Sequence, residues 1–201
     1  MHPNKRYIDN STQNIFHCHY PYHHNMQNII TTAIGFLHLS VMILENIYGM
    51  ITIKMPVLDN IYVFSIVGVS FSWILCKDEC LISYWIKKYE HPEYILGESP
   101  ENVSDISDLF PNKELYLWFY HVGNVCRVYS VFLVNGRSIH ISAWILHPTM
   151  ILYIFYVYDI LYNTSFRKWL FPYFQIVFGY FLGKMGYHMF HKIINTKFYL
   201  C

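Results

Sequence analysis

The chain has 201 residues, of which 54% are hydrophobic and 13% are charged, and its formal net charge is +1. An average soluble domain carries roughly 25% charged residues, so the composition argues against a soluble protein. The near-zero charge gives no basic surface that would point to nucleic acid, and five scattered cysteines without a CxxC pair argue against a secreted disulfide scaffold.

The N-terminal segment 1–28 is polar and rich in histidine, and it lacks the apolar core and cleavage site of a signal peptide. It contains a dense group of potential metal ligands, namely His17, Cys18, His19, His23 and His24. Such a cluster can chelate zinc or copper. Short His-rich tracts also occur as ordinary polar flanks before a membrane span, so both interpretations stay open.

Two apolar stretches follow, at 29–53 and 57–76. Each meets the length of roughly 20 residues that a membrane-spanning helix needs. Only three residues, from Lys54 to Pro56, separate them, which predicts a tight antiparallel hairpin. Charge is costly to bury in lipid, so Glu45 inside the first span is a candidate functional residue.

The one sizeable polar segment runs from 77 to 114, with nine acidic residues against four lysines. At its start, Leu81, Tyr84, Trp85 and Lys88 recur at helical spacing. This pattern predicts a short helix over 80–89 that lies on the membrane surface. The rest is punctuated by proline, glycine and serine and is expected to be a loop. We expect this segment to be the docking site if the protein has a protein partner.

Three further spans are expected in the second half, at 115–134, 140–162 and 169–190, before a short tail at 191–201. The stretch 115–134 is the weakest because it contains polar residues. The predicted fold is therefore all-α: a polytopic transmembrane bundle of about five helices, with a short interfacial helix after the second.

The lysine and arginine residues outside these spans predict the orientation in the membrane. Eight of them fall on the side of the N-terminus and four on the opposite side. Positive charge is enriched in cytoplasmic loops, so the sequence predicts an integral multi-pass protein with its N-terminus in the cytosol. Nothing in the sequence indicates which membrane it occupies.

Several polar residues inside the spans are candidate site residues. His121, Asn124 and Arg127 recur every three residues, so they share a broad helix face. If the first and third spans pack together, Arg127 neutralises Glu45, either as a structural ion pair or as part of a proton or substrate relay.

Histidines recur at or within the predicted spans, at His38, His121, His140, His147 and His188, and Lys184 lies one helical turn before His188. Two facing imidazoles can ligate haem, and three can hold zinc or iron. The sequence has neither HExxH nor the paired histidine boxes of membrane di-iron oxygenases. We therefore expect no cofactor, with haem or zinc as the alternative.

Gly179, Gly183 and Gly186 form a small-residue pattern in the fifth predicted span. Small residues let helix backbones approach closely in a membrane. The pattern predicts helix packing, either within the chain or between copies of it in a homo-oligomer.

The stretch WILCKDECLISYWIKK, from Trp73 to Lys88, continues to HPEYILG at His91–Gly97. In these residues the chain resembles uncharacterised multi-pass membrane proteins of giant DNA viruses. It is also similar to small bacterial membrane proteins of unknown function, through His38-Leu39 and the Trp and Cys that end the second span. The resemblance implies a polytopic membrane protein, and it brings no established catalytic residue.

Three functional hypotheses follow. The favoured one is a non-enzymatic membrane or virion-membrane component that acts through the 77–114 segment. The second is a small transporter or lipid-handling protein with a polar midplane site at Glu45, His121, Asn124 and Arg127. The third is a membrane enzyme with haem or metal bound by histidines.

Overall fold

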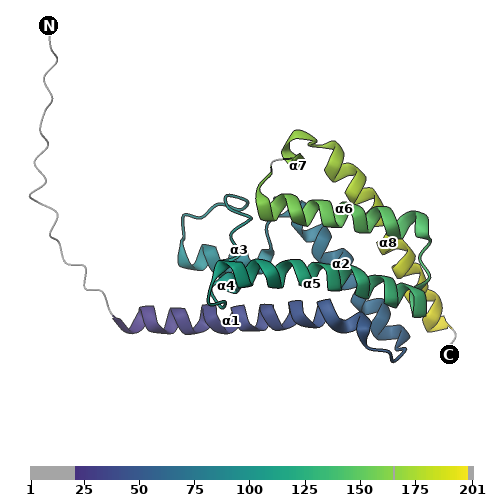
Figure 1. Cartoon of the computed structure of the whole chain (residues 1–201), viewed down its shortest axis with the longest axis horizontal. Helices are drawn as coiled ribbons and strands as arrows, with labels where there is room; N and C mark the ends of the chain where they lie inside the picture. Colours follow the sequence, from purple (N-terminus) through teal and green to yellow (C-terminus); the bar gives the residue numbers. More distant parts are fainter. Residues whose placement is uncertain (1–20, 165, 199–201) are drawn as a thin grey trace, which may run out of the picture.

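The computed structural model describes residues 21–164 and 166–198. Its helices, in chain order, are α1 (Pro21–Ile47), a 3-10 turn (Tyr48–Met50), α2 (Pro56–Leu75), α3 (Leu81–Glu90), α4 (Ser104–Ser107), α5 (Lys113–Val134), a π turn (Asn135–Ile139), α6 (Ala143–Tyr162), α7 (Phe166–Trp169) and α8 (Tyr173–Phe198). No strand occurs in these two ranges, and the prediction of an all-α helical bundle is confirmed (Figure 1).

Three helical segments among the described residues are long and apolar enough to cross a membrane: Ile29–Met50, Pro56–Leu75 and Ala143–Tyr162. The sequence predicted about five spans, so this count is smaller. Helices do form over the other two stretches, as α5 and α8. Their ionisable side chains, such as Arg127 and Lys184, lower their hydropathy, which is why they fall outside the apolar set.

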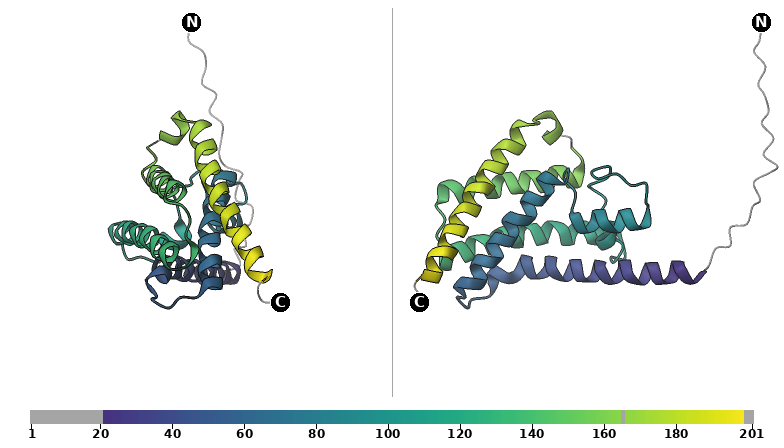
Figure 2. Two further views of the ribbon diagram at one scale, coloured as in Figure 1. Left: turned by 90° about the vertical axis from the view of Figure 1, so that its right-hand side faces the viewer. Right: turned by 180° about the vertical axis from the view of Figure 1, so that it is seen from behind.

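Helices α1 and α2 meet at the short turn and then diverge, whereas the sequence predicted a tight hairpin (Figures 1 and 2). Beyond the turn, α1 runs along α5 and α2 runs along α8. A buried polar cluster holds the turn. Arg137 Nη2 lies 2.5 Å from Asp59 Oδ1, and the Tyr48 hydroxyl donates to the same oxygen at 2.9 Å. The chain between α5 and α6 is thereby fixed against the turn.

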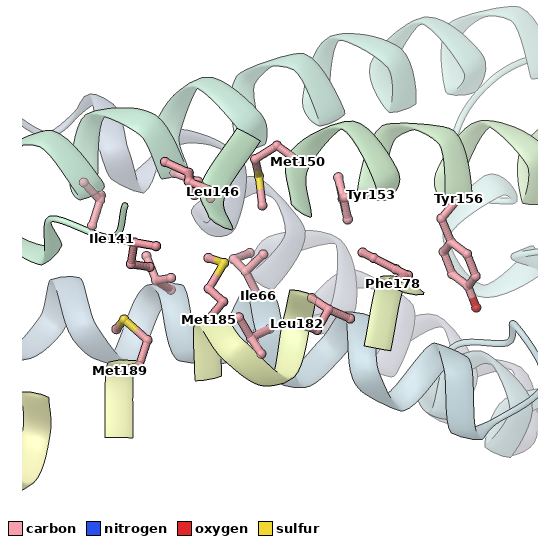
Figure 3. Packing of buried hydrophobic residues seen from close by; sticks show 14 of the residues in the cluster. Ile66, Ile141, Leu146, Met150, Tyr153, Tyr156, Phe178, Leu182, Met185 and Met189 are labelled. Atoms are coloured by element: carbon pink, nitrogen blue, oxygen red, sulfur yellow. The ribbon is translucent and has the colours of Figure 1, made fainter. Parts of the chain in front are cut away.

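The main core lies between α2, α6 and α8, with the end of α5 against it. Phe178, Leu182, Met185 and Met189 form one buried stripe along α8, at the spacing of a single helix face. Figure 3 shows Leu182 and Met185 of this stripe beside Ile66 of α2. This core holds α2, α6 and α8 together.

A second layer consists of α1, α3, α4 and α5, with α3 and α4 over the N-terminal half of α1 and beside the start of α5 (Figures 1 and 2). Close approach of α5 to α1 and to the 3-10 turn that follows α1 depends on glycines. A Cβ at Gly49 would lie 2.2 Å from the Ser130 carbonyl oxygen, and one at Gly123 would lie 2.5 Å from Asn46 Nδ2. This layer contains the candidate site.

Candidate functional site

Arg127 lies at the centre of a buried polar network between α1, α5 and α6. Its Nη2 lies 3.0 Å from Glu45 Oε2, and its other nitrogens donate to Asn46 Oδ1 at 3.1 Å and to the Tyr153 hydroxyl at 3.0 Å. The Tyr153 hydroxyl donates in turn to Asn124 Oδ1 at 2.8 Å. The structure thus joins Glu45, Asn124 and Arg127, and each of the three guanidinium nitrogens has a partner.

The remaining predicted polar residues are dispersed. His121 Nε2 lies 2.7 Å from the Tyr162 hydroxyl, away from the Arg127 network. The His147 Nδ1 is bonded to the Ala143 carbonyl of its own helix, and Lys184 lies over the Tyr180 ring. His188 is half-buried on α8.

The span predicted at 140–162 includes His140, but in the structure His140 lies before the helix begins. α6 begins at Ala143, and His140 instead follows the π turn in a left-handed conformation with φ 59°. The reason is local, because Asn135 Oδ1 accepts from the Ile141 N–H and holds the chain in a turn there.

Among residues 21–164 and 166–198, no group of three His, Cys, Asp or Glu side chains is placed to hold a metal ion. The predicted N-terminal ligands His17, Cys18 and His19 lie outside the described residues. His23 and His24 belong to the first turn of α1, where the structure describes the backbone alone.

The glycines of α8 differ from one another. A Cβ at Gly186 would lie 3.5 Å from Val67 of α2, so this glycine is at a helix contact. Gly179 and Gly183 face open space, with no described atom within 4 Å of an added Cβ. Packing within the described chain therefore accounts for Gly186 alone, and a homo-oligomer through the other two stays a prediction.

A second polar constellation brings together Cys80, His38 and Asp105. His38 Nδ1 lies 2.7 Å from Asp105 Oδ2, and His38 Nε2 lies 3.6 Å from Cys80 Sγ. An ionised carboxylate only accepts hydrogen bonds, so Nδ1 carries the proton and Nε2 faces the thiol. The order is thiol, imidazole and carboxylate, which is the arrangement of an activated nucleophile.

Three separate elements supply these side chains. His38 lies on α1, Asp105 lies on α4, and Cys80 is the N-cap residue of α3. The close approach of α4 to α1 requires Gly35, because a Cβ there would lie 2.2 Å from the carbonyl oxygen of Asp105. Gly35 precedes His38 by about one helical turn. The face of α1 that packs against α4 at Gly35 therefore also carries the His38 imidazole.

Burial is graded along the constellation. The Asp105 side chain is 1% exposed and that of His38 is 11% exposed. Burial raises the pKa of the Cys80 thiol, but the hydrogen bond and charge of His38 and the N–H groups of Ser83 and Ile82 outweigh it, so the pKa lies below the usual thiol range. Cationic neighbours and helix N-termini favour the thiolate in this way.

Cys80 and His38 both line a cavity of about 270 Å³, and Asp105 lies behind them. Glu45 and Arg127 line the same cavity. Tyr116 also lines it, is 6% exposed, and has no hydrogen-bond partner for its hydroxyl among the described residues. A buried hydroxyl without a partner loses the energy of a hydrogen bond, so the Tyr116 hydroxyl is an unused donor close to this cavity.

The sequence did not identify this constellation as a unit. His38 was noted as an imidazole inside the first span, but Cys80 and Asp105 were not selected as site residues. His38 is 42 residues from Cys80 and 67 from Asp105, so no short spacing links them. The available signal was a cysteine immediately before an amphipathic helix.

Comparison of the chain with protein-family models, with curated proteins and with solved structures found no match.

Proposed function

We propose that this chain is a multi-pass membrane protein that transfers acyl groups through Cys80. Three apolar helices support membrane insertion. In the full proposal α5 and α8 also cross the bilayer, which gives the five spans predicted from the sequence. Their polar side chains then face the protein interior, where Arg127 is paired with Glu45.

The observation that carries the acyl-transfer proposal is the relay from Asp105 through His38 to Cys80. Its thiol end lines a cavity and its carboxylate end is buried. A structural polar cluster has no need of an opening at its nucleophilic end. A nucleophile that receives a substrate requires one.

In the proposed reaction, His38 Nε2 takes the thiol proton and the sulfur attacks the carbonyl carbon of an ester or thioester. A carbon–sulfur bond forms, the bond to the leaving oxygen or sulfur breaks, and His38 returns the proton to that leaving atom. Water or another acceptor then attacks the acyl-Cys80, and its proton restores the thiol. Asp105 is a positioning residue that holds the imidazole in the required tautomer.

Groups that stabilise the developing oxyanion are also available. The N–H groups of Ile82 and Ser83, in the first turn of α3, face the Cys80 sulfur. They are placed to follow the negative charge from the sulfur to the substrate oxygen as the bond forms. Tyr116 lines the same cavity, and its hydroxyl has no hydrogen-bond partner among the described residues. Donors of this kind act most strongly in a site with little water.

The transporter and the non-enzymatic component, two of the three hypotheses drawn from the sequence, receive less support from the geometry. A transporter would use the Arg127 network, but its arginine already has Glu45, Asn46 and Tyr153 as partners, which favours a structural role. A non-enzymatic membrane component that acts through the 77–114 segment makes no use of the thiol relay, and it is the alternative that the experiment below distinguishes.

The test is covalent capture of the acyl group. Purified protein in mild detergent is treated with p-nitrophenyl butyrate, and peptides are analysed by mass spectrometry. We expect a hydroxylamine-sensitive butyryl group on Cys80. The Cys76→Ser variant, which alters a neighbouring cysteine, retains it, and Cys80→Ala loses it. An unmodified Cys80 in the wild-type protein contradicts the proposal.

A further inference from the structure

An apolar groove lies directly beside the thiol site. It has a volume of about 580 Å³ and is formed by α1 and α3. Ile30 and Ile34 form the α1 side, and Ile82, Trp85 and Tyr89 belong to the α3 side. Leu81 and Ile82 line this groove and also the cavity that contains Cys80 and His38. The two spaces therefore adjoin at the residue that follows the nucleophile.

We propose that this groove holds the hydrocarbon chain of the acyl substrate, so that the donor is a lipid ester or thioester rather than a short, polar acyl compound. This inference rests on the proposed acyl transfer at Cys80. It adds the substrate class, which the thiol relay alone leaves open.

The chemistry of the lining supports an apolar occupant. Apart from Thr31, every described residue that lines the groove is aliphatic or aromatic. Thr31 itself is buried at 9% exposure. Among the side chains that the structure describes, none that borders the groove is charged, in contrast to the adjoining cavity with its Glu45, Arg127 and His38. The carbonyl end of a lipid ester matches the polar cavity at Cys80, and its hydrocarbon chain matches the apolar groove.

The position of the groove supports entry from the bilayer. The α1 wall belongs to the apolar segment Ile29–Met50, in which Ile29 and Leu37 are 68% and 66% exposed. On α3, Trp85 is 68% exposed, and such aromatic residues are typical of the boundary between lipid and water. A chain that leaves the bilayer along α1 reaches the thiol without crossing water.

The length of the groove indicates the length of the chain. Leu81 and Tyr89 are eight residues apart on α3, which corresponds to about 12 Å at 1.5 Å per residue. An extended chain advances about 1.2 Å per bond. The groove therefore accommodates about ten carbons.

The experiment compares p-nitrophenyl butyrate with p-nitrophenyl decanoate as donors for Cys80, in detergent, with the acyl-Cys80 quantified by mass spectrometry. The variant Ile34→Trp fills the groove. Leu37→Trp adds the same bulk one helical turn away on α1, at a residue outside the groove and outside the site. The two esters partition into micelles to the same extent with either variant. Micelle partition therefore does not affect the difference between the variants in the decanoate-to-butyrate ratio of rates.

We expect the decanoate-to-butyrate ratio of acylation rates in the wild-type protein to exceed one by about an order of magnitude, because each buried methylene favours binding. Ile34→Trp lowers this ratio about tenfold, and Leu37→Trp leaves it unchanged. A ratio that Ile34→Trp does not change overturns the inference. If that variant alters only the size of the solubilised particle, the groove is a contact between copies, which also overturns it.

The outcomes separate the two proposals. Acylation of Cys80 at equal rates by both esters contradicts the groove inference and leaves the acyl transfer in place. Absence of acyl-Cys80 with either ester contradicts the acyl transfer itself.

Discussion

Two buried polar clusters lie in or against the segment 77–114, and they differ in whether their polar atoms are all occupied. In the first, the Glu79 cluster, Lys87 Nζ lies 2.7 Å from Glu79 Oε1, and the Tyr94 hydroxyl donates to the same oxygen at 2.8 Å. The Gly97 N–H donates to Glu79 Oε2, and Lys87 also donates to the Ser99 carbonyl. Both carboxylate oxygens and the ammonium group are therefore partnered.

The second, the His38 cluster, comprises His38, Cys80 and Asp105. Its carboxylate has one oxygen without a described partner, and its thiol lies at a cavity. Asp105 Oδ1 is buried without a hydrogen-bond partner among the described residues, and Cys80 lines a cavity that Tyr116, whose hydroxyl also lacks a partner among these residues, lines too. Glu79 and Cys80 are adjacent in the chain. The carboxylate of Glu79 is fully hydrogen-bonded within the protein, whereas Cys80 lines a cavity of about 270 Å³.

The comparison separates stability from function. A fully satisfied buried network contributes to a unique fold, because its removal leaves a buried charge alone. A cluster with vacant donors and acceptors does not maximise stability, and such sites are where reactivity is expected. We therefore expect substitutions in the Glu79 cluster to unfold the protein and substitutions in the His38 cluster to leave it folded and unreactive.

The largest effect is expected from Glu79→Ala. It leaves the Lys87 ammonium buried without its carboxylate, which costs roughly 3–5 kcal/mol of the free energy of unfolding. The measurement is the apparent Tm in detergent, compared with that of Cys80→Ala at the next residue. If the two variants lose the same stability, the distinction between the clusters does not hold.

The next effect concerns catalysis by His38. His38→Asn removes the group that takes the thiol proton, and general-base catalysis contributes about a hundredfold or more to a rate. We expect acylation of Cys80 by p-nitrophenyl butyrate to slow by at least about that factor while the apparent Tm changes little. His147→Asn, a change at an exposed histidine bonded to its own helix, is the control.

A smaller effect is expected from Gly35→Ala. The added Cβ would lie 2.2 Å from the Asp105 carbonyl oxygen, so α4 must move away from α1 and Asp105 with it. We expect acylation to slow about tenfold, because misplacement by an ångström costs up to about a hundredfold. Gly68→Ala on α2, where no described atom lies within 4 Å of the new Cβ, retains the wild-type rate.

The last effect is a shift in pH, and it is expected from Asp105→Asn, because the amide keeps the shape of the carboxylate but not its charge. A neutral partner stabilises the imidazolium less, so the thiolate forms at higher pH. We expect the midpoint of Cys80 alkylation against pH to move upward, with partial recovery in Asp105→Glu. A midpoint that stays in place while the Tm falls would assign Asp105 a purely structural role.

The sequence predicted the helices well because hydropathy and periodicity are local properties. The predicted stretch 115–134 corresponds to α5 at Lys113–Val134, and the predicted surface helix 80–89 corresponds to α3 at Leu81–Glu90. Apolar length also predicted spans over α5 and α8, whose ionisable side chains, such as Arg127 and Lys184, keep these two helices out of the most apolar set. The divergence of α1 and α2 depends on contacts with α5 and α8, which no local pattern encodes.

The candidate site was harder to predict than the helices. The pairing of Glu45 with Arg127 was anticipated because isolated charges in apolar helices need partners. The His38 cluster was missed because its order depends on a non-local contact, the approach of α4 to α1 over Gly35. Asp105 lies in a four-residue helix within a stretch predicted as loop, and its role became apparent only beside His38.

The most direct test is the pH dependence of alkylation by iodoacetamide at Cys76, Cys80 and Cys126, all partly exposed in one chain. The lowered pKa of the Cys80 thiol means that its thiolate is present at lower pH than an ordinary thiol near about 8.5. Alkylation of Cys80 is therefore expected to rise at lower pH in the wild-type protein than in His38→Asn, whereas the profiles of Cys76 and Cys126 are expected to be the same in both proteins. Coincident Cys80 profiles in the two proteins would contradict the assignment of Cys80 as an activated nucleophile.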